Sequence, residues 1–182
     1  MKYLLHGQES QRLKFRSIDT LDFDEWLEFH KDPSARKYWI EDFQDPLTEC
    51  ENWYQKQQYR YENDLGGMNA LIEKQSGKLI GHCGLLVQKV DGEEELEIGY
   101  SLLPKHWNKG FASEAAMKCR DFAFENNYWD HLISIISLTN IPSQKVAEKN
   151  GMTVSKRTTY GQNQVYIYRI DKGEWSSIVC KT

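Results

Sequence analysis

The residues with the clearest capacity for chemistry form a short loop, Trp107-Asn108-Lys109-Gly110-Phe111-Ala112-Ser113-Glu114, between a predicted strand and a predicted helix. A helix start presents free backbone N–H groups and a positive dipole end, so it can bind an anion. Gly110 leaves room for close approach and can adopt positive φ. Ala112 and Ser113 are small, and Lys109 adds charge. The loop is a candidate phosphate site, although one glycine alone is also typical of an ordinary loop.

Other phosphate and metal motifs do not fit this sequence. There is no Gly-x-x-x-x-Gly-Lys-[Ser/Thr], and no Gly-x-Gly-x-x-Gly follows a predicted strand, which argues against a P-loop and a dinucleotide fingerprint. The cysteines are scattered without a Cys-x-x-Cys pair or clustered histidines, so we expect no metal site. The same scatter predicts reduced thiols in a cytoplasmic protein.

The elements that position this loop follow from hydrophobic period and turn residues. Alternating or continuous apolar runs predict seven strands, at residues 12–18, 68–74, 79–90, 94–103, 132–138, 152–158 and 163–170. Four main helices begin at Asp22, Thr48, Ala112 and Asn140, and a short helical piece covers 34–40. Asp22–Glu25 and Thr48–Glu51 match the capping-box pattern. This order predicts an α+β fold with a mixed, mostly antiparallel sheet of about seven strands flanked by about four helices.

Length and composition limit the classes of function. The 182 residues predict a single domain over 1–182, and 40% apolar residues suffice for a core. The net charge of −4 does not suggest a nucleic-acid-binding face. No apolar run approaches a membrane span, and the first residues turn polar too soon for a signal peptide. We therefore expect no nucleic-acid partner and no membrane partner.

Two separated motifs resemble the GCN5-related N-acetyltransferase (GNAT) superfamily, in particular its ribosomal-protein alanine acetyltransferase branch. The first is Leu96 to Pro104 followed by Trp107 to Ala115. The second is Asn140-Ile141-Pro142-Ser143 followed by Val146 and Glu148 to Met152. The opening Arg12 to Arg16 also fits, and the resemblance covers roughly residues 11 to 175. It departs at Trp107, where the superfamily more often has Gln or Arg, which removes one side-chain contact to phosphate.

The resemblance implies acetyl-CoA as cosubstrate, no metal, and a sheet that splays between strands 4 and 5. The cofactor arm would then pair with the freed backbone of the fourth strand, as an added strand does. The matching cofactor-binding positions are Leu102, Leu103, Lys109, Gly110, Phe111, Ala112, Ser113, Asn140 and Ser143. Asn140 is equally suited to a plain helix N-cap, and the two roles are compatible.

Acyl transfer to an amine needs a proton acceptor, donors for the developing oxyanion and a leaving thiolate. Glu97 is the candidate base, because it lies on the strand that leads to the loop where many relatives carry a catalytic carboxylate. By alternation it shares a face with Gly99 and Ser101; a solvent-facing carboxylate is the alternative. Many relatives place an acidic Tyr at the position of Ala147. Ser143 is the candidate substitute, either as acid or to position the sulfur.

His82 and Cys83, on the third strand, could line an acceptor cleft, but a buried structural histidine is the favoured interpretation, and no neighbour would stabilise a Cys83 thiolate. We therefore expect direct attack in a ternary complex. The acceptor would be the amine of a protein N-terminus or of a small molecule, set by the N-terminal helices and the last hairpin. A non-catalytic acyl-CoA-binding or regulatory module is the alternative. The resemblance also allows a homodimer.

Overall fold

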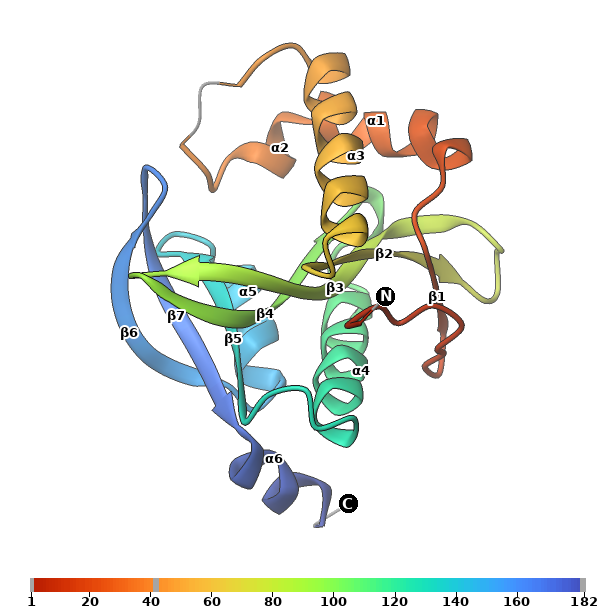
Figure 1. The fold of residues 1–182 in the computed structure, drawn as a ribbon. Coiled ribbons are helices and arrows are strands. Elements are labelled where there is room, and N and C mark those ends of the chain that lie inside the picture. Colours follow the sequence, from red (N-terminus) through yellow and green to blue (C-terminus); the bar gives the residue numbers. More distant parts are fainter. Residues whose placement is uncertain (1, 41–42, 181–182) are drawn as a thin grey trace.

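A computed structural model of the chain describes residues 2–40 and 43–180 (Figure 1). Seven strands form one sheet in the order β1-β2-β3-β4-β5-β7-β6. They are β1 (Leu13–Arg16), β2 (Gly66–Glu73), β3 (Leu79–Val90), β4 (Glu93–Leu102), β5 (His131–Ser137), β6 (Thr153–Tyr160) and β7 (Asn163–Asp171). All neighbours are antiparallel except β4 and β5, which run parallel and pair at Glu97 and Ile133 alone. The predicted fold class and the splay between strands 4 and 5 are confirmed.

The described residues contain six α-helices, more than the four main helices of the prediction. They are α1 (Phe23–Lys31), α2 (Pro33–Arg36), α3 (Pro46–Glu62), α4 (Phe111–Glu125), α5 (Ile141–Lys149) and α6 (Lys172–Val179), with short 3₁₀ turns η1 (Thr20–Asp22) and η2 (Pro104–His106). α6 is absent from the helices that the sequence predicts. This helix has eight residues and includes Gly173, so it has neither the length nor the propensity that makes a helix visible in sequence.

The helices cover both faces of the sheet, with α1, α2 and α3 on one face and α4 and α5 on the other (Figure 1). The α4 face holds the largest buried cluster, in which Phe111, Ala115 and Cys119 pack against β-strand side chains such as Leu85 and Ile98. The opposite face holds a smaller cluster around Trp26, Cys50 and Leu103. Alternation along β5 and β7 places Leu132 and Ile136 in the α4-face cluster and Ile133, Ile135 and Ile167 in a third buried cluster.

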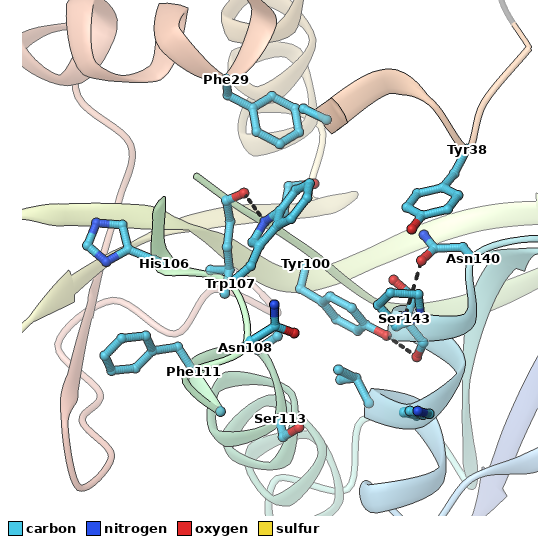
Figure 2. Close-up of a pocket in the computed structure, with 18 of the residues that line it drawn as sticks. Phe29, Tyr38, Tyr100, His106, Trp107, Asn108, Phe111, Ser113, Asn140 and Ser143 are labelled. Carbon is cyan, nitrogen blue, oxygen red and sulfur yellow. Dashed lines mark hydrogen bonds between the residues drawn. The ribbon is translucent and has the colours of Figure 1, made fainter. Parts of the chain in front are cut away.

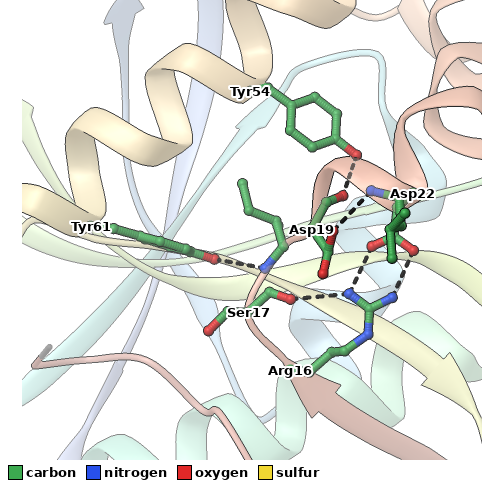
Figure 3. Close-up of polar contacts among 8 residues, drawn as sticks. Arg16, Ser17, Asp19, Asp22, Tyr54 and Tyr61 are labelled. Atoms are coloured by element: carbon green, nitrogen blue, oxygen red, sulfur yellow. Dashed lines mark hydrogen bonds and ion pairs between the residues drawn. The ribbon is translucent and has the colours of Figure 1, made fainter.

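The start of α1 differs from the capping box predicted at Asp22 and Glu25. The Asp22 side chain makes no cap hydrogen bond, because both its oxygens accept from Arg16 of β1, at 2.7 and 2.6 Å (Figure 3). Asp19 instead caps the preceding 3₁₀ turn through the N–H of Leu21. The prediction was wrong because a long-range ion pair uses the carboxylate that the local pattern assigned to the cap.

The start of α3 also differs from the prediction, which placed a capping box at Thr48 and Glu51. The helix begins two residues earlier, at Pro46, and Asp45 is its N-cap. Asp45 Oδ1 accepts from the N–H groups of Leu47 and Thr48 at 3.1 Å. An aspartate followed by proline at the first helical position is itself a strong helix start, so the wrong one of two adjacent signals was chosen.

Candidate functional site

A pocket of about 510 Å³ lies where β4 ends and α5 begins (Figure 2). One end is lined from α1, α2 and the residues after α2, by Phe29, Ala35, Lys37, Tyr38 and Trp39. The middle is lined by Tyr100, Ser101, Leu102, Asn140, Pro142 and Ser143. The other end is lined by His106, Trp107, Asn108, Gly110, Phe111, Ala112, Ser113, Lys145, Val146 and Lys149. The pocket therefore joins the two faces of the sheet beside the splayed end of β4.

The candidate phosphate loop forms the α4 end of this pocket. Gly110 is the N-cap of α4 and has φ +81°. This is the left-handed conformation that glycine adopts readily, as expected for this position. Phe111, Ala112 and Ser113 of the first turn line the pocket with it. Lys109 does not line the pocket, and its side chain is exposed. The free N–H groups in the first turn of this 15-residue helix therefore lie at this end of the pocket.

Trp107 occupies the position where the resembling motif more often has Gln or Arg. Its indole Nε1 donates to the carbonyl oxygen of Leu102 at 2.7 Å (Figure 2). The tryptophan therefore ties the loop to the end of β4, and the Leu102 carbonyl is already hydrogen-bonded.

The beginning of α5 forms one wall of the middle of the pocket. Asn140 is the N-cap, and its Oδ1 accepts from the N–H of Ser143 at 3.1 Å, so the predicted cap is confirmed. The Tyr100 hydroxyl donates to the Ser143 carbonyl oxygen at 2.9 Å (Figure 2). This hydrogen bond bridges β4 to α5 across the opening. Among the described residues the Ser143 hydroxyl has no hydrogen-bond partner, so it is available to a ligand in the pocket.

Leu102 and Leu103 were both predicted to face the cofactor arm, and the structure separates them. Leu102 lines the pocket. Leu103 is 2% exposed, packs in the cluster around Trp26, and donates its N–H to the carbonyl oxygen of Ile80 on β3 at 3.0 Å. Leu103 lies outside the pocket lining, because its backbone still pairs with β3.

Glu97 lies at the point where β4 and β5 separate, outside the lining of the pocket. It is half-buried, and its Oε2 accepts from Gln88 Nε2 at 2.7 Å. The N–H of Ile135 on β5 is 3.4 Å from its Oε1. Burial raises the pKa of Glu97 above its ordinary value, and the hydrogen bonds from Gln88 and Ile135 oppose this shift in part. A carboxyl group with a raised pKa is a better proton acceptor than an exposed one.

The pocket has a positive electrostatic character. The N-termini of both α4 and α5 open onto it, and helix N-termini carry partial positive charge. Lys145 and Lys149, one helical turn apart on α5, line the α4 end, and Lys37 lines the opposite end. No carboxylate belongs to the part of the lining that the structure describes. The site is thus suited to an anionic ligand with several phosphate oxygens.

His82 and Cys83, the remaining candidates, lie inside the protein. His82 is fully buried against Trp26 and Trp53, and its two ring nitrogens have no hydrogen-bond partner among the described residues. Cys83 is also fully buried, with its Sγ 3.5 Å from that of Cys119. Neither lines the pocket, so the structure supports the structural interpretation of both residues.

Several lining residues were not singled out from the sequence, above all Phe29, Tyr38, Tyr100 and Lys145. Tyr100 had a usable signal, because it alternates with Leu102 and so shares its face of β4. Phe29 and Tyr38 had none, since their approach to β4 depends on the packing of α1 and α2.

Residues 2–40 and 43–180 contain no group of three or more His, Cys, Asp or Glu side chains that could hold a metal ion. Within the same ranges, no helix combines the length and apolar character needed to cross a membrane.

Comparison with known proteins gives a consistent family assignment. Residues 12–153 match the model of the acetyltransferase (GNAT) domain. YkkB of Bacillus subtilis is 32% identical over 64% of this chain and 66% of its own length. The uncharacterized N-acetyltransferase p20 of Bacillus licheniformis is 29% identical over 92% of this chain and 97% of its own. A solved structure of RimL, a ribosomal L7/L12 alpha-N-protein acetyltransferase in complex with coenzyme A, has a TM-score of 0.72 at 15% identity, over 91% of this chain and 97% of that one.

Proposed function

The chain belongs to the GNAT acetyltransferase family, and on that premise we propose that it is an N-acetyltransferase that transfers an acetyl group from acetyl-CoA to a primary amine. The observation that carries the proposal is the pocket itself. It runs from the N-terminus of α4, past the splayed end of β4, to the α1 and α2 side of the sheet. Cosubstrate and acceptor can therefore approach one point from opposite faces, which is what direct attack in a ternary complex requires.

The residues at the α4 end fit the phosphates of coenzyme A. The first-turn N–H groups of α4 begin at Gly110, the N-cap, which itself lines the pocket. Lys145 and Lys149 supply two positive charges on the facing wall. The solved RimL structure that includes coenzyme A supports the assignment by its similar fold. Leu102, Phe111, Ala112, Ser113 and Asn140 complete this set of proposed cofactor contacts, whereas Leu103 and Lys109 lie outside the pocket lining.

The bound thioester supplies an activated acetyl group, and the protein must orient the amine and take up its proton. Glu97 is the proposed base, since its carboxyl group has a raised pKa and lies on the β4 face that carries Ser101 of the pocket. Glu97 does not itself line the pocket, so the proton reaches it through water. Backbone N–H groups on the unpaired edge of β4 are the proposed donors to the developing oxyanion.

The leaving sulfur is assigned to the middle of the pocket, beside Ser143. The position of a usual tyrosine acid is Ala147, which is 1% exposed and packed in the core. The Ser143 hydroxyl is available to position the sulfur, and the Tyr100 hydroxyl lies next to it (Figure 2). Burial strongly raises the pKa of Tyr100, so its phenol stays protonated and is a hydrogen-bond donor at neutral pH.

The acceptor is proposed to enter at the end formed by Phe29, Tyr38 and Trp39. The residues after α2 are held over this end, because Asn163 of β7 accepts from the N–H of Ile40 at 2.6 Å and donates to its carbonyl oxygen at 3.1 Å. An entrance lined by aromatic side chains fits one extended chain or one small molecule. The proposed acceptor is therefore a protein N-terminus, as the name of RimL states for that protein, or a small amine. The four cysteines are free thiols, which supports the cytoplasm as the compartment.

A melting experiment followed by an activity panel tests this proposal. Acetyl-CoA at about a hundredfold over its Kd should stabilise the protein by roughly 2.7 kcal/mol, or several degrees in Tm. Loss of thioester absorbance is then followed with peptides that have a free N-terminus, with N-acetylated twins of those peptides, and with amino acids and polyamines. Absorbance is preferable to a thiol reagent, because Cys180 is an exposed free thiol.

The outcomes separate the alternatives. Turnover that requires a free amine supports the acetyltransferase. A melting shift without turnover of any amine identifies a non-catalytic acyl-CoA-binding module. No shift with acetyl-CoA or with longer acyl-CoAs contradicts both functions.

A further inference from the structure

Arg12, immediately before β1, contacts the candidate phosphate loop at Lys109 to Phe111, although about a hundred residues separate the two in sequence. Its Nη1 donates to the carbonyl oxygen of Lys109 at 3.0 Å. Its guanidinium carbon lies 4.4 Å from the centre of the Phe111 ring. A Cβ added at Gly110 would be 3.4 Å from its Nη2. One guanidinium therefore lies against three consecutive residues of the loop.

Glu114 in the first turn of α4 holds this arginine in place. Its Oε2 accepts from Arg12 Nε at 2.6 Å, while its Oε1 accepts from the Arg12 N–H and the Ser10 hydroxyl, both at 2.7 Å. The Glu114 side chain is only 14% exposed. Burial raises the pKa of this carboxyl, but the hydrogen bonds from Ser10 and Arg12 outweigh burial and hold it below the ordinary value. The ion pair is therefore charged on both sides at neutral pH.

The geometry of a peptide group links this contact to the pocket. In a planar trans peptide the carbonyl of Lys109 and the N–H of Gly110 point in opposite directions. Because Arg12 binds that carbonyl oxygen, the Gly110 N–H is directed away from Arg12. Gly110 itself lines the pocket, whereas Arg12 does not. The arginine thus lies behind the loop, where it can fix the orientation of a donor without touching a ligand.

We propose that Arg12 is a positioning residue for the pyrophosphate of the cosubstrate, an inference that rests on the acetyl-CoA site proposed above. Together with Glu114 it fixes the Lys109–Gly110 peptide so that its N–H faces the phosphates. Trp107 fixes the other end of the loop by its hydrogen bond to Leu102. The loop lacks a Gln or Arg at position 107, so its affinity depends on backbone donors that are already ordered before binding.

The test compares ligands with and without the pyrophosphate. Calorimetry measures the Kd of coenzyme A, and melting measures the stabilisation by millimolar pantetheine, which lacks pyrophosphate and nucleotide. Arg12→Met should raise the Kd of coenzyme A about tenfold or more, the effect of misdirecting the Gly110 N–H and so losing its hydrogen bond to a charged phosphate. The melting shift with pantetheine should stay as in the wild type. A residue that only supported the fold would weaken both ligands alike.

Arg16→Met is the matched control. Arg16 is in β1, has a similarly exposed side chain at 36% against 43%, and forms a two-bond ion pair with Asp22 away from the loop. It should lower Tm and leave the Kd of coenzyme A unchanged. Arg12→Lys keeps the charge but cannot bridge Glu114 and Lys109 with a planar fork, so it should show an intermediate Kd and carries the test if Arg12→Met does not fold.

Failure of the inference and failure of the proposed function give different results. If the wild type does not bind coenzyme A, the proposed function fails. If the wild type binds it and Arg12→Met or Arg12→Lys binds it equally well, Arg12 has no positioning role. Equal weakening of coenzyme A and pantetheine also overturns the inference.

Discussion

Gln88 and Glu97 are joined across the β3–β4 hairpin by a hydrogen bond from Nε2 to Oε2 of 2.7 Å. The orientation of the Gln88 amide is fixed by its other partners. Its Oε1 accepts from Arg60 Nη2 at 2.9 Å and from the Tyr160 hydroxyl at 3.1 Å. The amide nitrogen is therefore left to donate to Glu97. A carboxylate held in one orientation beside a pocket, with its pKa raised by burial, has the properties of a general base.

Replacement of Glu97 by Gln should separate chemistry from binding. The amide keeps the size of the side chain and cannot take up a proton, so turnover should fall by about a hundredfold or more, while the melting shift with acetyl-CoA should remain. Glu95→Gln is the matched control, because Glu95 lies two residues earlier in β4 and binds His131 instead. Unchanged turnover in Glu97→Gln would remove this residue from the mechanism.

The stability of the same variant relative to the wild type should depend on pH. A carboxyl whose pKa is raised in the folded state contributes stability below its unfolded pKa, and this contribution is lost as pH rises through the folded value. For Glu97 that value lies above the ordinary 4.5. In urea unfolding the stability of Glu97→Gln relative to the wild type should therefore rise between pH 4.5 and pH 7.5, on top of a pH-independent loss, because the amide NH2 cannot accept the hydrogen bond that Gln88 or Ile135 donates. A difference that does not change with pH would contradict the raised pKa.

Gly110→Val should abolish the acetyl-CoA melting shift. A β-branched residue strains the φ of +81° by roughly 1–2 kcal/mol, and its Cβ would lie 3.4 Å from Arg12 Nη2, so the Lys109–Gly110 peptide and its N–H donor should shift. Gly77→Val, in the turn between β2 and β3, is the control: its φ is +69°, and an added Cβ would meet no atom within 4 Å. Both variants should lose Tm, and only Gly110→Val should lose cofactor binding. If the two bind acetyl-CoA alike, Gly110 is not at the phosphate site.

Local signals predicted the parts of the site that depend on one stretch of chain. Gly110 and Asn140 were predicted correctly in conformation, because a left-handed helix start and an N-cap are decided within four residues. The seven strands were predicted from alternating or continuous apolar runs, which are also local signals. The ion pair between Asp22 and Arg16 was not predictable, because no local pattern indicates that β1 brings Arg16 to the start of α1.

The parts of the site built by long-range contacts could not be predicted. Tyr100 reaches α5 only because β4 and β5 separate after a single paired position. Arg12 reaches Lys109 across the fold, and its sequence neighbours give no sign of it. Leu103 was expected to pair with the cofactor arm together with Leu102, but its N–H is hydrogen-bonded to the carbonyl oxygen of Ile80 on β3.

Ser143 and Tyr100 can be distinguished by single-atom changes. Ser143→Ala removes a hydroxyl that has no partner among the described residues. The free energy of unfolding should therefore stay within about 0.5 kcal/mol of the wild-type value, while turnover falls. Tyr100→Phe removes the bridge to the Ser143 carbonyl and should cost roughly 1 kcal/mol of stability. If Ser143→Ala keeps full turnover and Tyr100→Phe loses it, turnover depends on the Tyr100 hydroxyl and its bridge to α5, and not on the Ser143 hydroxyl.

His82 should make the protein sensitive to acid. Burial, the largest cause, lowers the pKa of His82 from 6.5 to about 3. The unfolded state therefore binds a proton that the folded state does not bind. The free energy of unfolding falls as pH falls from about 6.5 toward 3. The slope from this one residue approaches about 1.4 kcal/mol per pH unit only well below pH 6.5, so the loss between pH 7.5 and pH 5.5 totals about 1.4 kcal/mol. Urea unfolding at pH 7.5 and pH 5.5 measures it.

His82→Phe should flatten that dependence, because phenylalanine fills the space between Trp26 and Trp53 and takes up no proton. It also removes two buried nitrogens that have no partner among the described residues, so stability at pH 5.5 should exceed that of the wild type. His6→Gln, which changes an exposed histidine, should keep the wild-type slope. If the free energies of unfolding of wild type and His82→Phe change equally between the two pH values, burial does not hold His82 neutral. The His82 ring must then be hydrogen-bonded or protonated in solution.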